Sequence, residues 1–355
     1  MTTLHIDPTK GMEFGLYSLG DHMKNPLDGK RISAKQRIDE LVEAAVLAEQ
    51  AGIDVFGVGE SHQTYFTTQA HTVVLGAIAQ ATERIKLTSS ATVLSVSDPV
   101  RVYEDFATID LLSNGRAEIV AGRGSRVGAY HLLGVDLQDY EDIFEEKLAL
   151  LKLINEEDVI NWEGKFRAPL KGAMIYPQPL EDRLPIWRAV GGPPGSAIKA
   201  GRMGLPMMLT TLGGPAINFK YSVDSYREAL IENGYDPKEF PVATTSLFHV
   251  GNTPQEALRG MYPHIDSGFK TIRGTGYPKA QFAESVNKTD ALMVGDKNQI
   301  IEKLLFQHEL YGMNRFMAQL DFGGVPFDKI MKNIEIIGND ILPEIKKYTR
   351  EEEVN

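Results

Sequence analysis

The sequence predicts an α/β protein built as a (β/α)8 TIM barrel with insertions, and three observations lead to this fold. Eight short apolar runs alternate with amphipathic segments along the 355 residues, the order expected of a closed parallel sheet covered by helices. The segment 98–125 shows the repeating unit most clearly, because a capped helix is followed at once by the apolar strand 117–122. No repeat or low-complexity tract divides the chain, so we expect residues 1–355 to form a single domain.

Short apolar runs bounded by glycine, proline or polar residues mark the eight expected strands. These strands are residues 12–18, 54–60, 85–94, 117–122, 185–190, 204–210, 241–250 and 315–322. Apolar residues at helical spacing follow them. The expected helices are residues 33–52, 68–82, 98–114, a stretch around 144–151, one entered through the turn 191–196, residues 219–233, one opened by Thr253-Pro254, and residues 296–311 and 327–348.

The expected helix starts carry recognisable capping patterns. Ser33 and Gln36 have the spacing of a capping box, in which each side chain bonds the other residue's backbone. Asp98 is a capping residue placed before Pro99, whose missing N–H is harmless at the first helical position. The pair Asn114-Gly115 tolerates the left-handed conformation that ends a helix.

Two stretches depart from the alternation and are expected to be insertions. Near residues 156–184, the run 159–168 is typical of a small extra hairpin. Near residues 261–292, the chain has no clean helical period and many glycines, including Gly268, that could absorb backbone rotation. We interpret this second insertion as a mobile lid that closes a pocket. An ordered insertion without that role is the alternative.

Composition limits the class of protein. Hydrophobic residues make up 43% of the chain and charged residues 24%, as in ordinary globular proteins. The formal net charge of -11 argues against a nucleic acid as partner. The absence of cysteine excludes disulfides, a thiol nucleophile and an iron–sulfur cluster. No basic-then-apolar leader and no long apolar run occurs, so we expect a cytoplasmic protein without a membrane partner.

Chemistry in such barrels lies on the loops that follow the strands, and two of these loops contain several glycines. The turn Gly191–Ser196 opens a helix, where free N–H groups and the helix dipole attract phosphate. Its two prolines remove two donors, which leaves Gly192, Gly195 and Ser196. A plain tight turn is the alternative.

The second loop, residues 122–125, ends the strand 117–122 and has the sequence Gly-Arg-Gly-Ser. It approaches a dinucleotide-binding pattern, but the acidic residue that this pattern needs after the next strand is missing. We therefore expect Arg123, with the hydroxyl of Ser125, to bind an anion. A structural arginine paired with a carboxylate is the alternative.

Glu60, Ser61 and His62 end the second expected strand. One histidine and one carboxylate, even with His71 nearby, fall short of the ligand sets of zinc sites, so we expect no metal. His62 suits a hydrogen bond to a ligand or acid–base work near neutral pH, and a structural histidine is the alternative. His249, which closes the seventh strand, is interpreted as structural.

Together these segments resemble the bacterial luciferase-like flavin monooxygenases over nearly the whole chain. The resemblance rests on MEFGLYS (12–18), AEQAGIDVFGVGESH (48–62), IKLTSSATVL (85–94), DPVRVYEDFATIDLLSNGRAEIVAGRGS (98–125) and AGRMGLPMML (200–209). It implies a (β/α)8 barrel that uses reduced FMN or, in some branches, the deazaflavin F420.

The resemblance also implies roles for single residues. His62 matches the second histidine of the strand-two motif and Arg123 matches an arginine of the flavin site, so these are the expected catalytic residues. Ser61 stands where luciferase has its catalytic histidine, and Gly122 stands where luciferase has its reactive cysteine. Light emission from a long-chain aldehyde is therefore not expected.

The expected flavin site combines two parts of the barrel. The resemblance implies a non-prolyl cis peptide under the flavin ring and a phosphate-binding turn after the fifth strand. The expected cofactor-binding residues are Ser90, Ala91, Arg123, Ser125, Gly191, Gly192, Gly195 and Ser196.

The resemblance implies a flavin-dependent oxidoreductase, first of all a two-component monooxygenase that uses FMNH2 and O2 on a small organic substrate. We find no nicotinamide-binding domain, so a separate flavin reductase would be a transient partner. An F420-dependent hydride-transfer oxidoreductase and a non-catalytic flavin-binding protein are the alternatives. We also expect a homodimer through residues 68–82 and 98–112, because 68–82 has more apolar residues than one barrel-facing stripe needs.

Overall fold

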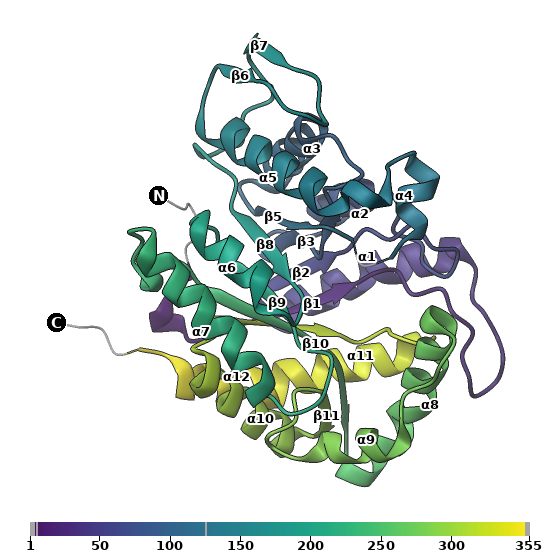
Figure 1. Ribbon diagram of the computed structural model, residues 1–355. Coiled ribbons are helices and arrows are strands. Elements are labelled where there is room, and N and C mark those ends of the chain that lie inside the picture. Colours follow the sequence, from purple (N-terminus) through teal and green to yellow (C-terminus); the bar gives the residue numbers. More distant parts are fainter. Residues whose placement is uncertain (1–3, 5, 125, 352–355) are drawn as a thin grey trace.

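Eight parallel strands close into a barrel, as the sequence predicts (Figure 1). The structure is a computed structural model that describes residue 4 and residues 6–124 and 126–351. In order around the barrel, the strands are β1 (Glu13–Ser18), β2 (Val55–Val58), β3 (Lys86–Ser89), β5 (Ala117–Gly122), β8 (Ile186–Val190), β9 (Met207–Thr210), β10 (Val242–Gly251) and β12 (Arg315–Gln319). Strand β12 returns to pair with β1 and closes the circuit.

Further short strands extend or decorate the barrel. The expected strand 85–94 is divided, because β4 (Thr92–Val93) continues beyond β3 and pairs with β5. An antiparallel hairpin of β6 (Ile160–Trp162) and β7 (Leu170–Ala173) confirms the first insertion as a hairpin, although it extends past the expected residue 168. Strand β11 (Met293–Asp296), which the sequence did not predict, pairs with the end of β10.

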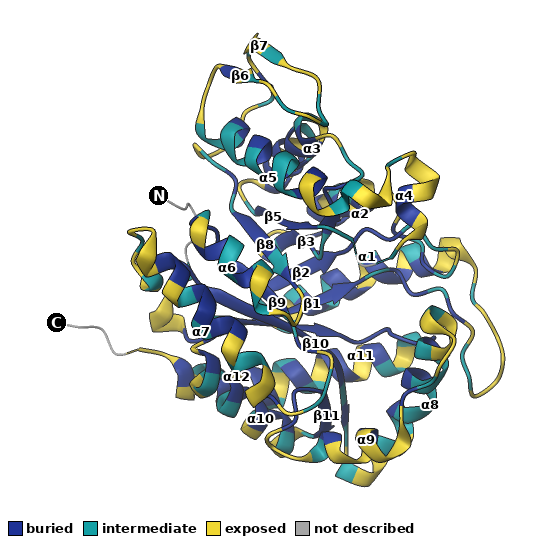
Figure 2. Cartoon of the chain, viewed as in Figure 1, coloured by how far each residue is buried: buried dark blue, intermediate teal, exposed yellow. Residues whose placement is uncertain are grey.

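Helices cover the outside of the barrel, and their buried faces point toward the strands (Figure 2). The helices are α1 (Ala34–Gln50), α2 (His71–Ala81), α3 (Pro99–Ser113), α4 (Gly128–Leu133), α5 (Tyr140–Glu156), α6 (Pro194–Arg202), α7 (Ile217–Glu232), α8 (Pro254–Arg273), α9 (Lys279–Ala283), α10 (Lys297–Tyr311), α11 (Phe327–Ile336) and α12 (Leu342–Thr349). A π-helical turn, Ile337–Ile341, joins the last two. None of the helices in the described residues is long and apolar enough to cross a membrane.

Capping side chains set several helix ends. Ser33 accepts a hydrogen bond from the backbone N–H of Gln36 at 3.1 Å. The Gln36 side chain bonds Glu40 at 2.9 Å instead of returning to Ser33, so only half of the expected capping box forms. Asp98 accepts from the N–H of Val100 at 2.9 Å, and Asn114 ends α3 with a φ of 59°.

The second insertion is more regular than its sequence suggests, because α8 continues to Arg273. The expectation of an irregular segment from residue 261 is therefore wrong for its first half. The buried stripe of this helix mixes apolar, small and polar residues, which hides the helical period: Ala257, Met261, His264, Ile265 and Gly268. A Cβ on Gly268 would lie 2.5 Å from Phe322, so close packing rather than hinge motion explains this glycine.

A buried lysine fixes the far end of the same insertion. The ammonium group of Lys303, on α10, donates hydrogen bonds to the carbonyl oxygens of Ser285 and Leu292. Burial lowers the pKa of Lys303 to about 8, and the charge of Asp290 opposes this shift. The insertion is thus held at both ends, and its expected role as a lid stays a prediction for the residues between Gly274 and Ser285.

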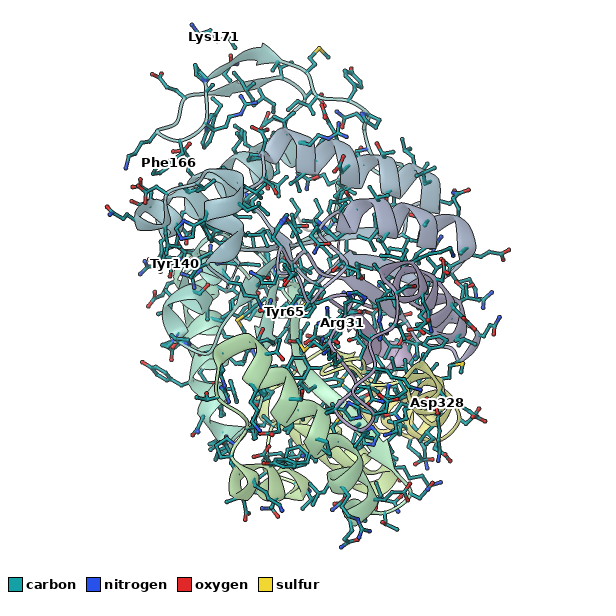
Figure 3. All side chains as sticks on the ribbon, turned by 90° about the vertical axis from the view of Figure 1, so that its right-hand side faces the viewer. Arg31, Tyr65, Tyr140, Phe166, Lys171 and Asp328 are labelled. Carbon is teal, nitrogen blue, oxygen red and sulfur yellow. The ribbon has the colours of Figure 1, made fainter. Side chains whose placement is uncertain are left out.

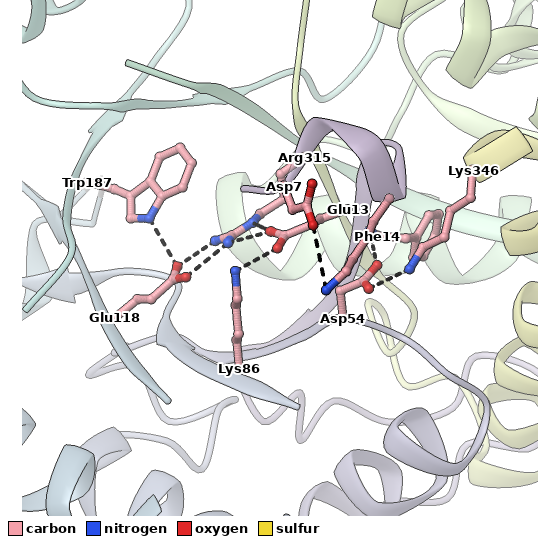
Figure 4. Close-up of polar contacts among 10 residues, drawn as sticks. Asp7, Glu13, Phe14, Asp54, Lys86, Glu118, Trp187, Arg315 and Lys346 are labelled. Carbon is pink, nitrogen blue, oxygen red and sulfur yellow. Dashed lines mark hydrogen bonds and ion pairs between the residues drawn. The ribbon is translucent and has the colours of Figure 1, made fainter. Parts of the chain in front are cut away.

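A network of charged side chains fills the amino end of the barrel (Figure 4). Arg315 of β12 donates hydrogen bonds to Glu118 of β5 at 2.5 and 2.9 Å and to Glu13 of β1 at 2.7 Å. Trp187 donates its indole N–H to Glu118 at 3.0 Å, and Lys86 donates to Glu13 at 2.6 Å. Burial alone would lower the pKa of Arg315, but the two carboxylates raise it instead. The network therefore keeps its charges although it is buried.

An apolar cluster lies in the barrel interior next to this network and includes side chains from seven barrel strands. It consists of Leu4, Tyr17, Val55, Val120, Trp187, Met208, Ala243 and Met317, with Ile6, Ala91 and Ala189 packed against it. The presence of Leu4 and Ile6 shows that the amino-terminal segment contributes to this filling. The amino end of the barrel is therefore packed with side chains, and a ligand site is left to the carboxyl end.

We expect Arg315→Met to lower the free energy of unfolding by about 3–5 kcal/mol, because the carboxylates of Glu118 and Glu13 would stay buried without their main partner. Urea unfolding followed by circular dichroism measures this loss. Arg101→Met is the matched control, since the ion pairs of Arg101 on α3 are exposed and should be worth less than about 1 kcal/mol. Equal stability losses in the two variants would contradict a structural role for the buried network.

Candidate active site at the carboxyl end of the barrel

Small residues form the floor of the barrel mouth. The peptide bond between Ser90 and Ala91 is cis, as the resemblance implies. A Cβ on Gly122 would lie 3.2 Å from the Cβ of Ala91 and 3.5 Å from that of Ala189, so these three positions are neighbours. Because no side chain among them extends beyond Cβ, a ligand can approach this floor closely.

Glu60 and His62 form a hydrogen-bonded pair beside the floor, which we call the Glu60–His62 dyad. The backbone N–H of Glu60 donates to the carbonyl oxygen of Ala91 at 2.9 Å, which joins the loop after β2 to the floor. His62 Nε2 lies 2.6 Å from Glu60 Oε1, and Glu60 Oε2 accepts from the N–H of Val93 at 2.7 Å. The carboxylate thereby fixes the orientation of the imidazole, as in sites where a histidine moves a proton.

The surroundings of the dyad affect its protonation. Burial raises the pKa of Glu60, and the hydrogen bonds from His62 and Val93 oppose that rise. His71 lies behind the dyad, with Nε2 at 2.8 Å from the hydroxyl of Thr92. Burial lowers the pKa of His71 to about 3, and the charge of His62 adds to this effect. His71 is therefore neutral at physiological pH, and a proton transfer at this place depends on His62.

The described residues contain no group of three or more histidine, cysteine or acidic side chains arranged to hold a metal ion. His249 lies away from the dyad, on the part of β10 that pairs with β11, where its register partner is Val294. Burial lowers the pKa of His249 to about 4. Its place in the fold agrees with the structural interpretation.

Arg123 turns away from the centre of the mouth. Its guanidinium donates to Glu141 at 2.6 Å and lies 5.4 Å from the ring centre of Tyr140. Figure 3 looks onto the carboxyl ends of the strands, and there Tyr140 lies toward the edge of the molecule while Tyr65 lies near its middle. The pairing with Glu141 is the alternative that the sequence left open, and a role of Arg123 in cofactor binding stays a prediction.

Arg126, three residues further along, points toward the middle of the mouth. Its guanidinium lies 5.0 Å from the ring centre of Phe66, and the side chain of Tyr65 acts on its pKa. Its charge also acts on Tyr17, an inward-facing residue of β1. The spacing of two arginines in one loop cannot show which of them faces inward. Ser125, between them, lies outside the described residues.

Tyr17 belongs to the mouth although sequence reasoning missed it. Burial raises the pKa of Tyr17, and the side chain of Thr245 on β10 opposes that rise. The signal was present, because alternate residues of a barrel strand face inward and the inward-facing Glu13 lies four residues before Tyr17.

The glycine turn Gly191–Ser196 leads from β8 into α6, as expected. Helix α6 begins at Pro194 after Pro193, and no side chain caps its first turn. No atom lies within 4 Å of the place that a Cβ would take on Gly191, Gly192 or Gly195. The helix start is therefore open, with the unpaired N–H groups of a first turn directed outward.

A buried cation lies next to this helix start. Arg188 of β8 is fully buried, and its Nε lies 3.4 Å from the hydroxyl oxygen of Ser196. Glu145 holds the guanidinium with contacts of 2.6 and 2.8 Å. Open N–H groups, a hydroxyl and a nearby cation form a donor set that fits a phosphate group.

Comparisons with known proteins agree with this geometry. The barrel is shared with monooxygenase RslO1 of Streptomyces bottropensis, at a TM-score of 0.83 and 20% identity over 94% of this chain and 99% of that chain. It is also shared with the FMN-bound oxygenating constituent of 3,6-diketocamphane monooxygenase from Pseudomonas putida. Here the TM-score is 0.75 and the identity 19%, over 94% of this chain and 98% of that chain.

Similarity in sequence extends to enzymes with a different cofactor. The F420-dependent glucose-6-phosphate dehydrogenase of Rhodococcus erythropolis is 27% identical over 310 residues, which cover 69% of this chain and 90% of that protein. The family model of luciferase-like monooxygenases matches residues 12–315, which span the barrel from β1 to the start of β12. The predicted fold and the resemblance are thereby confirmed, and the chain belongs to the luciferase-like monooxygenase family of enzymes.

Proposed function

We propose that the protein is the oxygenase component of a two-component monooxygenase, which uses reduced FMN and O2 to oxidise a small organic substrate. The observation that carries this proposal is the Glu60–His62 dyad beside a floor of small residues at the barrel mouth. The FMN-bound monooxygenase constituent of the same fold supports FMN as cofactor. A separate flavin reductase would supply the reduced flavin as a transient partner.

The residues present fit FMN. The open glycines of the turn Gly191–Ser196 and the first N–H groups of α6 would hold the phosphate, with Arg188 behind them. The floor at Ala91 and Gly122 would support the ring system. Bound reduced FMN supplies the electrons that activate O2.

The protein's own contribution is positioning, proton handling and the exclusion of water. The Glu60 carboxylate orients His62, so that the imidazole can hold or release a proton at the nitrogen that does not face Glu60. The packed interior around Tyr17 and Trp187 keeps bulk water from reaching the floor from below. These roles agree with the expected catalytic role of His62.

A second candidate function is hydride transfer from reduced F420, which the F420-dependent relative favours. A non-catalytic flavin-binding protein is the third alternative. The dyad argues against it, because a protein that only stores flavin has no need for an oriented histidine.

We expect FMN rather than F420 to bind, and we expect O2 consumption coupled to substrate oxidation when a flavin reductase supplies FMNH2. Fluorescence titration with each cofactor measures the first outcome. An oxygen electrode combined with product analysis over a panel of organic substrates measures the second. Tight F420 binding without FMN binding would contradict the proposed monooxygenase and support the hydride-transfer alternative. FMN binding without any turnover over the panel would favour the non-catalytic alternative.

We expect Ser196→Asp to weaken FMN binding by at least about 1 kcal/mol, because the new carboxylate would repel the phosphate at the start of α6. Riboflavin, which lacks the phosphate, should bind Ser196→Asp and the unchanged protein equally. The control Thr271→Asp adds the same charge to the exposed surface of α8. Equal FMN affinity in Ser196→Asp and the control would show that this turn does not bind the phosphate.

We expect Glu60→Gln to lower kcat by at least about tenfold with little change in KM. The uncharged amide would no longer orient the imidazole of His62 or stabilise its protonated form. The pH dependence of kcat should change as well, whereas FMN affinity should not. Glu104→Gln, which removes a half-buried carboxylate from α3, far from the dyad in sequence, is the control. A kcat that stays the same in Glu60→Gln would show that the dyad has no part in the reaction.

We also propose a homodimer through α2 and α3. Val73 is 72% exposed on α2, and Leu111 and Leu112 are exposed on α3, so the pair of helices presents an apolar surface. Light scattering at micromolar concentration should give twice the chain mass of 39.3 kDa. Val73→Asp together with Leu112→Asp should give the monomer mass, because the charges would be buried in the interface. A monomer mass for the unchanged protein would exclude this dimer.

A further inference from the structure

Arg126 is a partly buried cation for which the described residues provide no carboxylate. Its Nε is buried and has no hydrogen-bond partner. The groups that act on the pKa of Arg126 are the side chains of Tyr65 and Tyr17, and neither is a carboxylate. Burial lowers the pKa of Arg126, yet an arginine stays protonated in proteins. Among the described residues, no negative charge pairs with this partly buried cation.

Other buried or partly buried arginines of the described chain have carboxylate or backbone partners. Arg315 has Glu118 and Glu13, Arg188 has Glu145, and Arg37 has Glu40 at 3.1 Å. Arg116, which lacks a carboxylate, donates instead to four backbone carbonyl oxygens and a hydroxyl. Arg126 has neither arrangement. Because a partly buried charge without a partner is costly, a bound anion would complete the environment of Arg126.

The position of Arg126 identifies which ligand this anion belongs to. The loop after β5 abuts the loop after β2, since a Cβ on Gly128 would lie 3.2 Å from the Gln63 side chain. Arg126 therefore faces the mouth between Tyr17 and the loop that carries the Glu60–His62 dyad. The flavin phosphate has a separate candidate site at α6, which follows a different strand. The anion at Arg126 is thus left to the molecule that is oxidised.

We propose that Arg126 binds the carboxylate of the substrate, which is therefore a small organic acid with an apolar body. The guanidinium can meet a carboxylate with two parallel hydrogen bonds, which fixes the direction of the bound molecule. The rings of Phe66 and Tyr65 form an aromatic wall next to that carboxylate. The carboxylate end is then held at Arg126, and the apolar end extends over the floor toward the dyad. This inference rests on the proposed function, because it assigns the substrate class of the same site.

Pairs of acids and their amides test the inference, because each amide keeps the shape of its acid without the charge. The probes are benzoate, phenylacetate and hexanoate, each compared with benzamide, phenylacetamide and hexanamide. Calorimetry measures their binding to the full-length protein with and without FMN. We expect at least one acid to bind at least about tenfold more tightly than its amide. Arg126→Leu should bind that acid and its amide equally, and the control Arg101→Leu should keep the preference.

Each result decides for or against the proposal. If no acid is preferred to its amide, or if Arg126→Leu keeps the preference, Arg126 does not select the substrate. If Arg126→Leu weakens FMN binding more than twofold, Arg126 belongs to the flavin site and the proposal is overturned. Failure of the unchanged protein to bind FMN contradicts the proposed function alone, because the comparison of acids and amides is also made without flavin. Should Arg126→Leu not fold, Arg126→Lys decides, and we expect it to reduce the preference several-fold.

Discussion

The contact between Arg315 and the carboxylates of Glu118 and Glu13 holds the barrel together from the inside. It joins the last barrel strand, β12, to β5 across the interior and to the first strand, β1, at the seam where the barrel closes. Buried ion pairs are costly unless every charge is met, and here Trp187 and Lys86 complete the set. A shift of any strand by one residue would turn its side chain outward, so only one register satisfies all the charges.

Because this network occupies the amino ends of the strands, stability and chemistry are placed at opposite ends of the barrel. At the carboxyl ends, the polar side chains form the candidate site and do not hold the strands together. Both oxygens of Glu60 are engaged, by His62 and by the backbone of Val93, so the imidazole is held in place before any ligand arrives. Arg126 is the opposite case, since the described chain supplies no negative charge to match it. We therefore propose different roles for the two charges, proton transfer for the Glu60–His62 dyad and substrate binding for Arg126.

The sequence predicts those parts of the structure that depend on local patterns. Asp98 and Asn114 bound α3 because capping and the left-handed conformation are properties of single residues. Gly268 indicates a hinge in the sequence, but the structure explains this glycine by the Phe322 ring, which is distant in sequence and leaves no room for a Cβ. The same limit applies to the mouth. Which of Arg123 and Arg126 faces the mouth depends on the carboxylate of Glu141, on α5, which pairs with Arg123. This is a tertiary contact, and the spacing of residues along the chain does not predict it.

The packing of the amino end has a consequence for kinetics. Trp187, Arg315 and Leu4 fill the interior there, so within the described chain a ligand on the floor can enter and leave only through the mouth. Where one ligand lies deeper than another in such a dead-ended space, the outer one must leave before the inner one can. A high concentration of the outer ligand then slows release of the inner one. For a deeper flavin and an outer substrate, as proposed above, flavin exchange would wait for the product to leave.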